Sequence, residues 1–261
     1  CSTWCFNTMS PEEVYTQIGS YDAFQGVEAV THPPSFHLSV QWTDDRVEEI
    51  KKVLANNGLE LSAVSPATDF LQFDEDGKNA QIHHTMAHID LARRFGCRQL
   101  RIFAGGRVPE GRGRKEMIDA VVACLEPAAE YAADRGVVLS IENHGQFGRV
   151  YDLISAVFEA VQSPWVGMTL HTGGVERMRG DYLEMVREFA PRITHMHLND
   201  SAPPSGGRPR QCAVGEGTLD MPAILAILDE TGYDGYYNLE FGGDGSDELI
   251  RKSLAYLDQV G

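Results

Sequence analysis

The feature that most constrains the fold is a regular alternation of short apolar runs with amphipathic segments along the whole chain. Eight such runs predict β-strands at 1–6, 26–30, 59–64, 98–103, 137–142, 165–171, 192–198 and 235–240. Between them, apolar residues recur at helical spacing, as in 44–57, 113–135 and 220–231. Eight strands, each followed by a helix, over about 250 residues are typical of a TIM barrel. We therefore predict the α/β class and a single (β/α)8 barrel domain spanning 1–261, and not an open doubly wound sheet, because no GxGxxG motif follows the first strand.

Charge and cysteine content restrict the classes of partner. The chain has 22 Lys and Arg against 38 Asp and Glu, which gives a formal net charge of −16. So acidic a protein is a poor match for nucleic-acid phosphates or anionic membrane surfaces. No apolar run approaches the roughly 18 residues of a membrane span. The five cysteines are scattered and form no CxxC pair, which indicates a reducing, cytoplasmic location.

The last four predicted strands all finish in side chains that can bind a metal ion. These residues are Glu142, His171, His197 and Glu240. Because the carboxyl ends of neighbouring barrel strands meet at one rim, we expect the four side chains to converge. The residues two positions earlier on each strand share their face and are mostly polar, so these faces should point into the barrel. Two carboxylates and two imidazoles could hold one divalent ion, Mn²⁺, Zn²⁺, Co²⁺ or Mg²⁺, with positions left open for substrate.

Two more histidines lie near these strand ends. His195 precedes His197 by two residues and should lie deeper on the same face, behind the ligands or as a core histidine. His144 follows the strand that Glu142 closes, and its unperturbed pKa near 6.5 suits proton transfer at neutral pH. Alternatively, His144 is a loop histidine that only hydrogen-bonds the backbone.

Several segments resemble the sugar isomerase/epimerase superfamily, whose fold is the xylose-isomerase-like barrel. The matching pieces are GVEAV (26–30), LSIENHG (139–145), GMTLHTGG (167–174), ITHMHLND (193–200), AVGEGTLDMPAIL (213–225) and GYDGYYNLEF (232–241). They follow the family order over nearly the whole chain. The resemblance implies that Glu142, His171, His197 and Glu240 hold one divalent metal. Many relatives have Asp-Thr-Gly-His where this chain has His171 to Gly174, so the site has one negative charge less and lacks a substrate-holding histidine.

The resemblance implies a metal-dependent isomerase or epimerase of a sugar or keto-sugar, in which the metal stabilises an enediolate. Glu142 and Glu240 would relay protons, with His144 as the free acid or base. One alternative is a lyase of the same fold, which cleaves a C-glycoside of a 3-oxo sugar or dehydrates a keto-inositol. A second is a non-catalytic barrel that binds a sugar or serves as a partner subunit. The resemblance also allows a homo-oligomer.

Further residues are candidates for substrate binding. They are Trp4, Phe6, His32, Arg208, Arg210 and Glu216. The two arginines follow strand 192–198, in a long loop rich in Pro, Gly and Ser that we interpret as an active-site loop, and could hold hydroxyls or a phosphate. The two aromatic residues and the histidine, at the tips of the first two strands, could form an apolar wall. The glutamate is a landmark of the resembled family at the barrel mouth.

HLNDS (197–201) also resembles the endonuclease IV branch of these barrels. That branch builds a three-zinc cluster with further histidines after strands three and four. Here these strands run into Ser65-Pro66-Ala67 and Ala104-Gly105-Gly106. With a net charge of −16 as well, the sequence argues against DNA repair.

Overall fold

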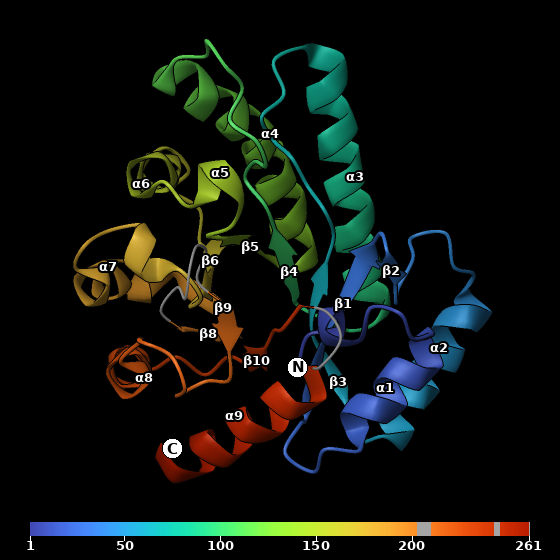
Figure 1. Cartoon of the computed structure of the whole chain (residues 1–261). Helices are drawn as coiled ribbons and strands as arrows, with labels where there is room; N and C mark the ends of the chain where they lie inside the picture. The colour runs from blue at the N-terminus through green and yellow to red at the C-terminus, as the bar shows by residue number, and fades with distance from the viewer. Residues whose placement is uncertain (203–209, 243–245, 261) are drawn as a thin grey trace.

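The computed structural model describes residues 1–202, 210–242 and 246–260. Its strands gather at the centre and its helices surround them (Figure 1). The sheet order is β10-β7-β6-β5-β4-β3-β1-β2, and every pair of neighbours is parallel except β1 with β2. Sequential strands are thus neighbours in space, with helices between them, as in a TIM barrel. The predicted fold class is confirmed.

The strands are β1 (Gly26–His32), β2 (Ser35–Phe36), β3 (Glu60–Ser65), β4 (Gln99–Ile102), β5 (Val138–Glu142), β6 (Val166–His171), β7 (Ile193–Leu198), β8 (Asp200–Ala202), β9 (Arg210–Cys212) and β10 (Tyr237–Leu239). The α-helices are α1 (Pro11–Gly19), α2 (Asp44–Asn56), α3 (Glu75–Arg94), α4 (Arg114–Arg135), α5 (Gly145–Gly148), α6 (Tyr151–Ala160), α7 (Tyr182–Phe189), α8 (Met221–Glu230) and α9 (Ser246–Val260). Short 3-10 helices are η1 (Thr3–Phe6), η2 (Val175–Arg177) and η3 (Ala190–Arg192).

The first predicted strand, 1–6, is wrong beyond its second residue. Ser2 forms a parallel bridge with Glu28 of β1, and its amide donates to a carbonyl of β10 at 2.9 Å. Ser2 therefore joins the two ends of the sheet where a full strand was expected. The chain then turns into η1, because the Ser2 hydroxyl accepts a hydrogen bond from the Trp4 amide and caps this helix. The turn places Trp4 at the barrel mouth.

Side-chain caps mark the starts of two helices. Ser10 and Glu13 form the reciprocal capping box of α1, and the Asp220 side chain caps α8 by accepting from the Ala223 amide. The three segments with apolar residues at helical spacing correspond to α2, α4 and α8. Their apolar residues join the core that surrounds the sheet.

The two faces of the later strands differ in polarity. Leu139 and Leu170 on the outward faces belong to the hydrophobic core. On the inward faces, the Thr169 hydroxyl donates to Ser140 Oγ at 2.8 Å, and Asn238 Nδ2 lies 3.2 Å from His195 Nε2. The alternation that the sequence predicts therefore directs the polar face of these strands into the barrel.

The segment after β7 contains regular structure that the sequence did not predict. β8 and β9 form a two-stranded antiparallel ribbon. The carboxylate of Asp200 accepts from the amides of Gly215 and Gly217, at 3.2 and 3.0 Å, and so fixes the return of this segment. Residues 203–209, including Arg208, lie outside the described residues.

In the described ranges, no helix combines the length and apolar character needed to cross a lipid bilayer. All five cysteines are unpaired and buried. Burial raises the pKa of Cys5 to about 12 and that of Cys97 to about 11, so both are thiols at neutral pH. Such buried thiols act as small apolar core residues.

Candidate metal centre

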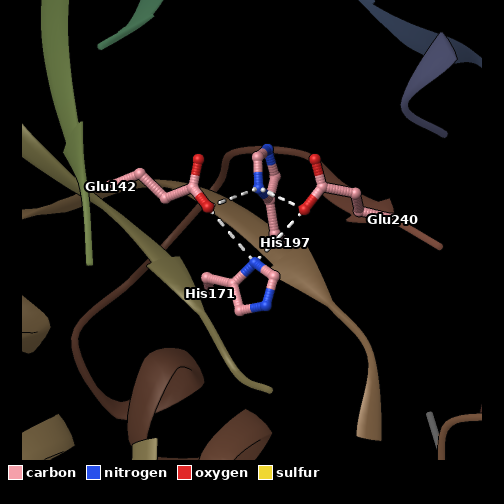
Figure 2. Close-up of side chains that lie close together, drawn as sticks. All are labelled: Glu142, His171, His197 and Glu240. Carbon is pink, nitrogen blue, oxygen red and sulfur yellow. Dashed lines mark ion pairs between the residues drawn. The ribbon is translucent and has the colours of Figure 1, made fainter. Parts of the chain in front are cut away.

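Four side chains from the carboxyl ends of β5, β6, β7 and β10 meet at one point of the barrel mouth (Figure 2). They are Glu142, His171, His197 and Glu240, and one ligand atom of each lies within 4.8 Å of all the others. His171 Nδ1 is 3.3 Å from Glu142 Oε1 and 3.2 Å from Glu240 Oε2. His197 Nδ1 is 3.6 and 3.2 Å from the same two oxygens. The fold thus brings together the residues that the sequence predicts as metal ligands.

The chemistry of this four-residue cluster fits a divalent metal ion. The Nδ1 atoms of His171 and His197 are buried and have no hydrogen-bond partner among the described residues, although carboxylate oxygens lie beside them. Buried polar atoms are rarely left unpaired in this way. Two imidazole nitrogens and two carboxylate oxygens are a ligand set suited to Mn²⁺, Fe²⁺, Co²⁺ or Zn²⁺. A cation between them would satisfy all four atoms.

The far side of His197 is held by Glu28, a residue that the sequence analysis missed. Glu28 Oε2 lies 2.6 Å from His197 Nε2 and 2.7 Å from His195 Nε2. The other oxygen accepts from the Ser65 hydroxyl at 2.8 Å. A carboxylate behind an imidazole fixes the ring so that its other nitrogen faces the metal position. His195 lies deeper, as expected, and contacts Glu28. A glutamate within the apolar run GVEAV was the available clue.

Two asparagines fix the end of β6 around His171. Asn143 Oδ1 accepts from the His171 amide at 2.6 Å, and its Nδ2 donates to the His171 carbonyl at 3.0 Å. Asn199 Nδ2 lies 3.1 Å from His171 Nε2 and also donates to the Glu240 carbonyl at 3.1 Å. These bonds join the ends of β5, β6, β7 and β10, so the ligand side chains are held by the backbone of four strands.

The cluster is strongly polarised in the absence of a metal. Burial disfavours charge on every member, but His197 and His171 together outweigh it and lower the pKa of Glu240 to about 2 and that of Glu142 well below its usual range. Against the same cost of burial, the glutamates raise the pKa of His171 and bring that of His197 well above 6.5. The carboxylates thus favour protonated imidazoles, and the imidazoles favour ionised carboxylates. A divalent ion would compete with protons for the two imidazoles.

A cavity of about 220 Å³ lies beside the cluster. Its lining residues are Trp4, Val30, His32, Arg101, Phe103, Glu142, His144 and Glu240. The Arg101 guanidinium is buried, with Nε 3.3 Å from Glu142 Oε2, and packs 4.1 Å above the Phe103 ring. Arg101 therefore places a positive charge on the back of Glu142. The sequence analysis missed Arg101 and Phe103, although an arginine within the run RQLRIF indicates a buried charge.

Five of the predicted catalytic and substrate-binding residues line this cavity: Glu142, Glu240, His144, Trp4 and His32. The rings of Trp4 and His32 lie 5.6 Å apart, and the His144 ring is 5.0 Å from that of Phe103. Burial lowers the pKa of His144, so its imidazole is neutral at pH 7 and can accept a proton. Within the described ranges, this imidazole makes no hydrogen bond, so the predicted alternative of a backbone-bonded loop histidine is not seen.

The other predicted substrate residues lie outside the described lining of the cavity. Phe6, at the end of η1, is partly buried and packs against the hydrophobic core. Glu216 forms an ion pair with Lys252 at 3.3 Å. Arg210 is exposed on β9, and Arg208 lies outside the described residues. A role of the two arginines stays a prediction.

Residues 18–260 match the family described as xylose isomerase-like TIM barrel. The rhizopine catabolism protein MocC of Rhizobium meliloti is 28% identical over 218 residues, 73% of this chain and 65% of that protein. The chain thus spans less than two thirds of the length of this relative. An inosose dehydratase of Geobacillus thermodenitrificans is 20% identical over 219 residues, 73% of this chain and 72% of that protein.

Solved structures share the architecture. A D-allulose 3-epimerase from Methylomonas sp., in complex with D-allulose, has a TM-score of 0.81 at 16% identity and covers 100% of this chain and 96% of its own. A xylose isomerase-like TIM barrel protein from Mycobacterium smegmatis, in complex with magnesium, has a TM-score of 0.75 at 20% identity, with coverages of 95% and 87%. At these identities the likeness establishes the fold.

Proposed function

The chain belongs to the xylose isomerase-like TIM barrel family, and on that premise we propose that it is a divalent-metal-dependent isomerase or epimerase of a sugar or keto-sugar. One observation carries the proposal: two buried, unpaired Nδ1 atoms face two carboxylates beside a small cavity. A relative that is a dehydratase and a neighbour that is an epimerase support chemistry at a carbon next to a carbonyl.

The four-residue cluster of Glu142, His171, His197 and Glu240 would hold the ion. We expect Mn²⁺, with Co²⁺, Zn²⁺, Mg²⁺ or Fe²⁺ as alternatives. When bound, the ion acts as a Lewis acid on a carbonyl oxygen of the substrate and so acidifies the neighbouring C–H group. Since His171 is neutral once it has lost its extra proton, the two carboxylates balance the charge of the ion. The family aspartate at this position would leave a net negative charge.

Proton transfer is assigned to residues that line the cavity. His144 is neutral, lies in the cavity and can take the proton from the carbon next to the carbonyl. Glu142 and Glu240 lie on opposite sides of the cluster (Figure 2). An epimerase removes a proton from one face of a carbon and returns it to the other, so it needs acid-base groups on both sides. Trp4 and Phe103 supply apolar walls that exclude water.

A lyase is the second candidate, and the dehydratase relative favours it. The first step is the same proton removal by His144, after which a hydroxyl or aglycone leaves and His144 returns the proton to it. Product analysis separates the two reactions, because only the lyase forms a new C=C bond. A cavity of about 220 Å³ supports a small molecule as the substrate. The unpaired cysteines support our expectation of a reducing cytoplasm.

The test combines metal content with proton exchange. Protein purified without chelator is expected to contain about one divalent ion per chain, lost in Glu142→Ala and His171→Ala. Glu248→Ala, which removes an exposed glutamate paired with Lys252, is the matched control and keeps the metal. The metal-loaded protein should exchange a carbon-bound proton of a keto-sugar with D2O, measured by NMR. An ion-free chain after soaking in each metal, or no exchange across a panel of sugars and keto-sugars, would refute the proposal.

A further inference from the structure

An arginine-lined concavity lies next to the metal centre. It has a volume of about 550 Å³ and is lined by Arg149, Val150, Tyr151, Asp152, Arg177, Met178 and Arg179. These residues come from the end of α5, the start of α6, and η2 with the residues that follow it. These elements follow β5 and β6, at the same end of the barrel as the ligands (Figure 1). Three arginines in one concavity stand out in a chain with a net charge of −16.

Two of the three guanidinium groups lack a close counter-charge. Arg179 is ion-paired with Glu184 and Glu188 at 3.1 and 2.7 Å. In contrast, the side chains of Arg149 and Arg177 form no ion pair or hydrogen bond with any residue in the described ranges. Arg149 is half-buried; burial and the nearby charge of Arg177 lower its pKa, which Glu142 and Glu176 oppose. The two groups repel one another, and an anion between them would relieve that repulsion.

The absence of a side chain at Gly174 leaves space for the Arg177 guanidinium. A Cβ atom at Gly174 would lie 2.1 Å from Arg177 Nη2 and 2.9 Å from its Cζ. Gly174 also has φ +100°, a conformation that side-chain-bearing residues rarely adopt. The guanidinium thus lies directly against bare backbone, and any side chain at this position would displace it.

The concavity shares a wall with the metal centre. Met178 in its lining has its sulfur 3.3 Å from Asn143 Nδ2. The Asn143 side chain is in turn hydrogen-bonded to the amide and the carbonyl of the predicted ligand His171. Arg149 also interacts electrostatically with both Glu142 and His144. Arg149 is therefore close enough to the predicted ligands to interact with them electrostatically, and Asn143 and Met178 lie between the concavity and His171.

We propose that Arg149 and Arg177 bind an anionic group of the substrate, a phosphate or a carboxylate, while its carbonyl end occupies the metal centre. Guanidinium groups present paired N–H donors that match both kinds of anion. This inference rests on the proposed function, because it takes the anionic group to be part of the molecule that reacts at the metal centre.

The first test measures anion binding without catalysis. Inorganic phosphate and, separately, acetate are titrated calorimetrically into the full chain without added metal. We expect phosphate binding to weaken about tenfold or more in Arg149→Gln and in Arg177→Gln. The matched control is Arg251→Gln, which removes an exposed arginine paired with Asp247 on α9 and should leave binding unchanged. Because Arg177 is exposed, its replacement should not unfold the chain, and circular dichroism checks both variants.

The outcomes separate the two proposals. Phosphate binding that depends on both arginines supports the anion site, even if no substrate is found and the isomerase proposal fails. Stronger binding of phosphate than of acetate indicates a phosphorylated substrate, and the reverse indicates a carboxylate. If neither phosphate nor acetate binds, or if neither variant weakens the binding, the proposed anion site is refuted. The proposed function would then still hold without the anion site if Arg149→Gln and Arg177→Gln both retain proton exchange on uncharged keto-sugars.

Discussion

Replacement of Glu28 by glutamine changes one buried group behind the metal centre and leaves all four predicted ligands in place. The carboxylate oxygen Oε2 lies between two imidazole nitrogens, 2.6 Å from His197 Nε2 and 2.7 Å from His195 Nε2. Glutamine has the same size but no charge. Its amide oxygen can accept from one imidazole, and its NH2 group would face the other or the Ser65 hydroxyl.

The size of the effect follows from these contacts. A hydrogen bond to a charged group contributes about 1.5–3 kcal/mol, and both bonds here are short and fully buried. Loss of one of them at His197 corresponds to about a 10- to 100-fold weaker affinity for the metal, since about 1.4 kcal/mol is a factor of ten. Carboxylates that support a metal-bound imidazole elsewhere show effects of about this size.

Calorimetric titration with Mn²⁺ measures this loss in Glu28→Gln against the unchanged chain. Binding should remain at one ion per chain, whereas His197→Ala should abolish it. Ser65→Ala is the matched control, since it removes only the hydroxyl that donates to Oε1, and we expect its affinity to stay within about threefold. A folded Glu28→Gln protein with unchanged Mn²⁺ affinity, or an equal loss in Ser65→Ala, would refute the assignment of Glu28 as the residue that positions His197.

Further predictions concern pH and backbone conformation. In the metal-free chain, the raised pKa of His197 stabilises the fold fully below pH 6.5, and this contribution is lost as the pH rises through the folded-state pKa. The lowered pKa of Glu240 contributes above pH 4.5 and is lost as the pH falls towards about 2, so both contributions are present together between pH 4.5 and 6.5, and in that range urea unfolding should show the largest loss of stability in His197→Gln relative to the unchanged chain. Since His171 and His197 must lose protons to bind an ion, Mn²⁺ affinity should rise with pH above 6.5, and calorimetry in two buffers should detect the released protons. A pH-independent affinity would contradict this. Gly145→Ala should destabilise the chain by more than Gly58→Ala in urea unfolding, because both have positive φ, costing about 1–2 kcal/mol, but only at 145 would the new Cβ meet a backbone carbonyl, at 2.7 Å. Equal losses of unfolding free energy in Gly145→Ala and Gly58→Ala would contradict this prediction.

The fold was accessible from the sequence because strand and helix periodicities repeat along the chain. Apolar periodicity acts over a few turns of the chain, so α2, α4 and α8 could be placed by local rules. The first strand was misplaced because one hydroxyl, that of Ser2, caps a 3-10 helix after a single bridge. Over only six residues, the pattern of polar and apolar residues does not distinguish a full strand from a single bridge followed by a 3-10 helix.

The predicted ligands could be found because they come from consecutive parallel strands. Their position in the sequence already implies a common rim. Glu28 and Arg101 were missed because they belong to β1 and β4, and only closure of the barrel brings them behind the ligands. The same holds for Arg149 and Arg177, which in the sequence are indistinguishable from solvated loop charges.

The sequence by itself determined the order of the parallel strands from β1 to β10, the inward direction of their polar faces and the strand ends that carry the predicted ligands, because all three follow from periodicity and chain direction. The tertiary structure decided which charges are buried, which imidazole nitrogen is held by Glu28 and which is left free, and which arginines lack a counter-charge. These properties depend on distances between residues far apart in the chain, which arise only when the barrel closes.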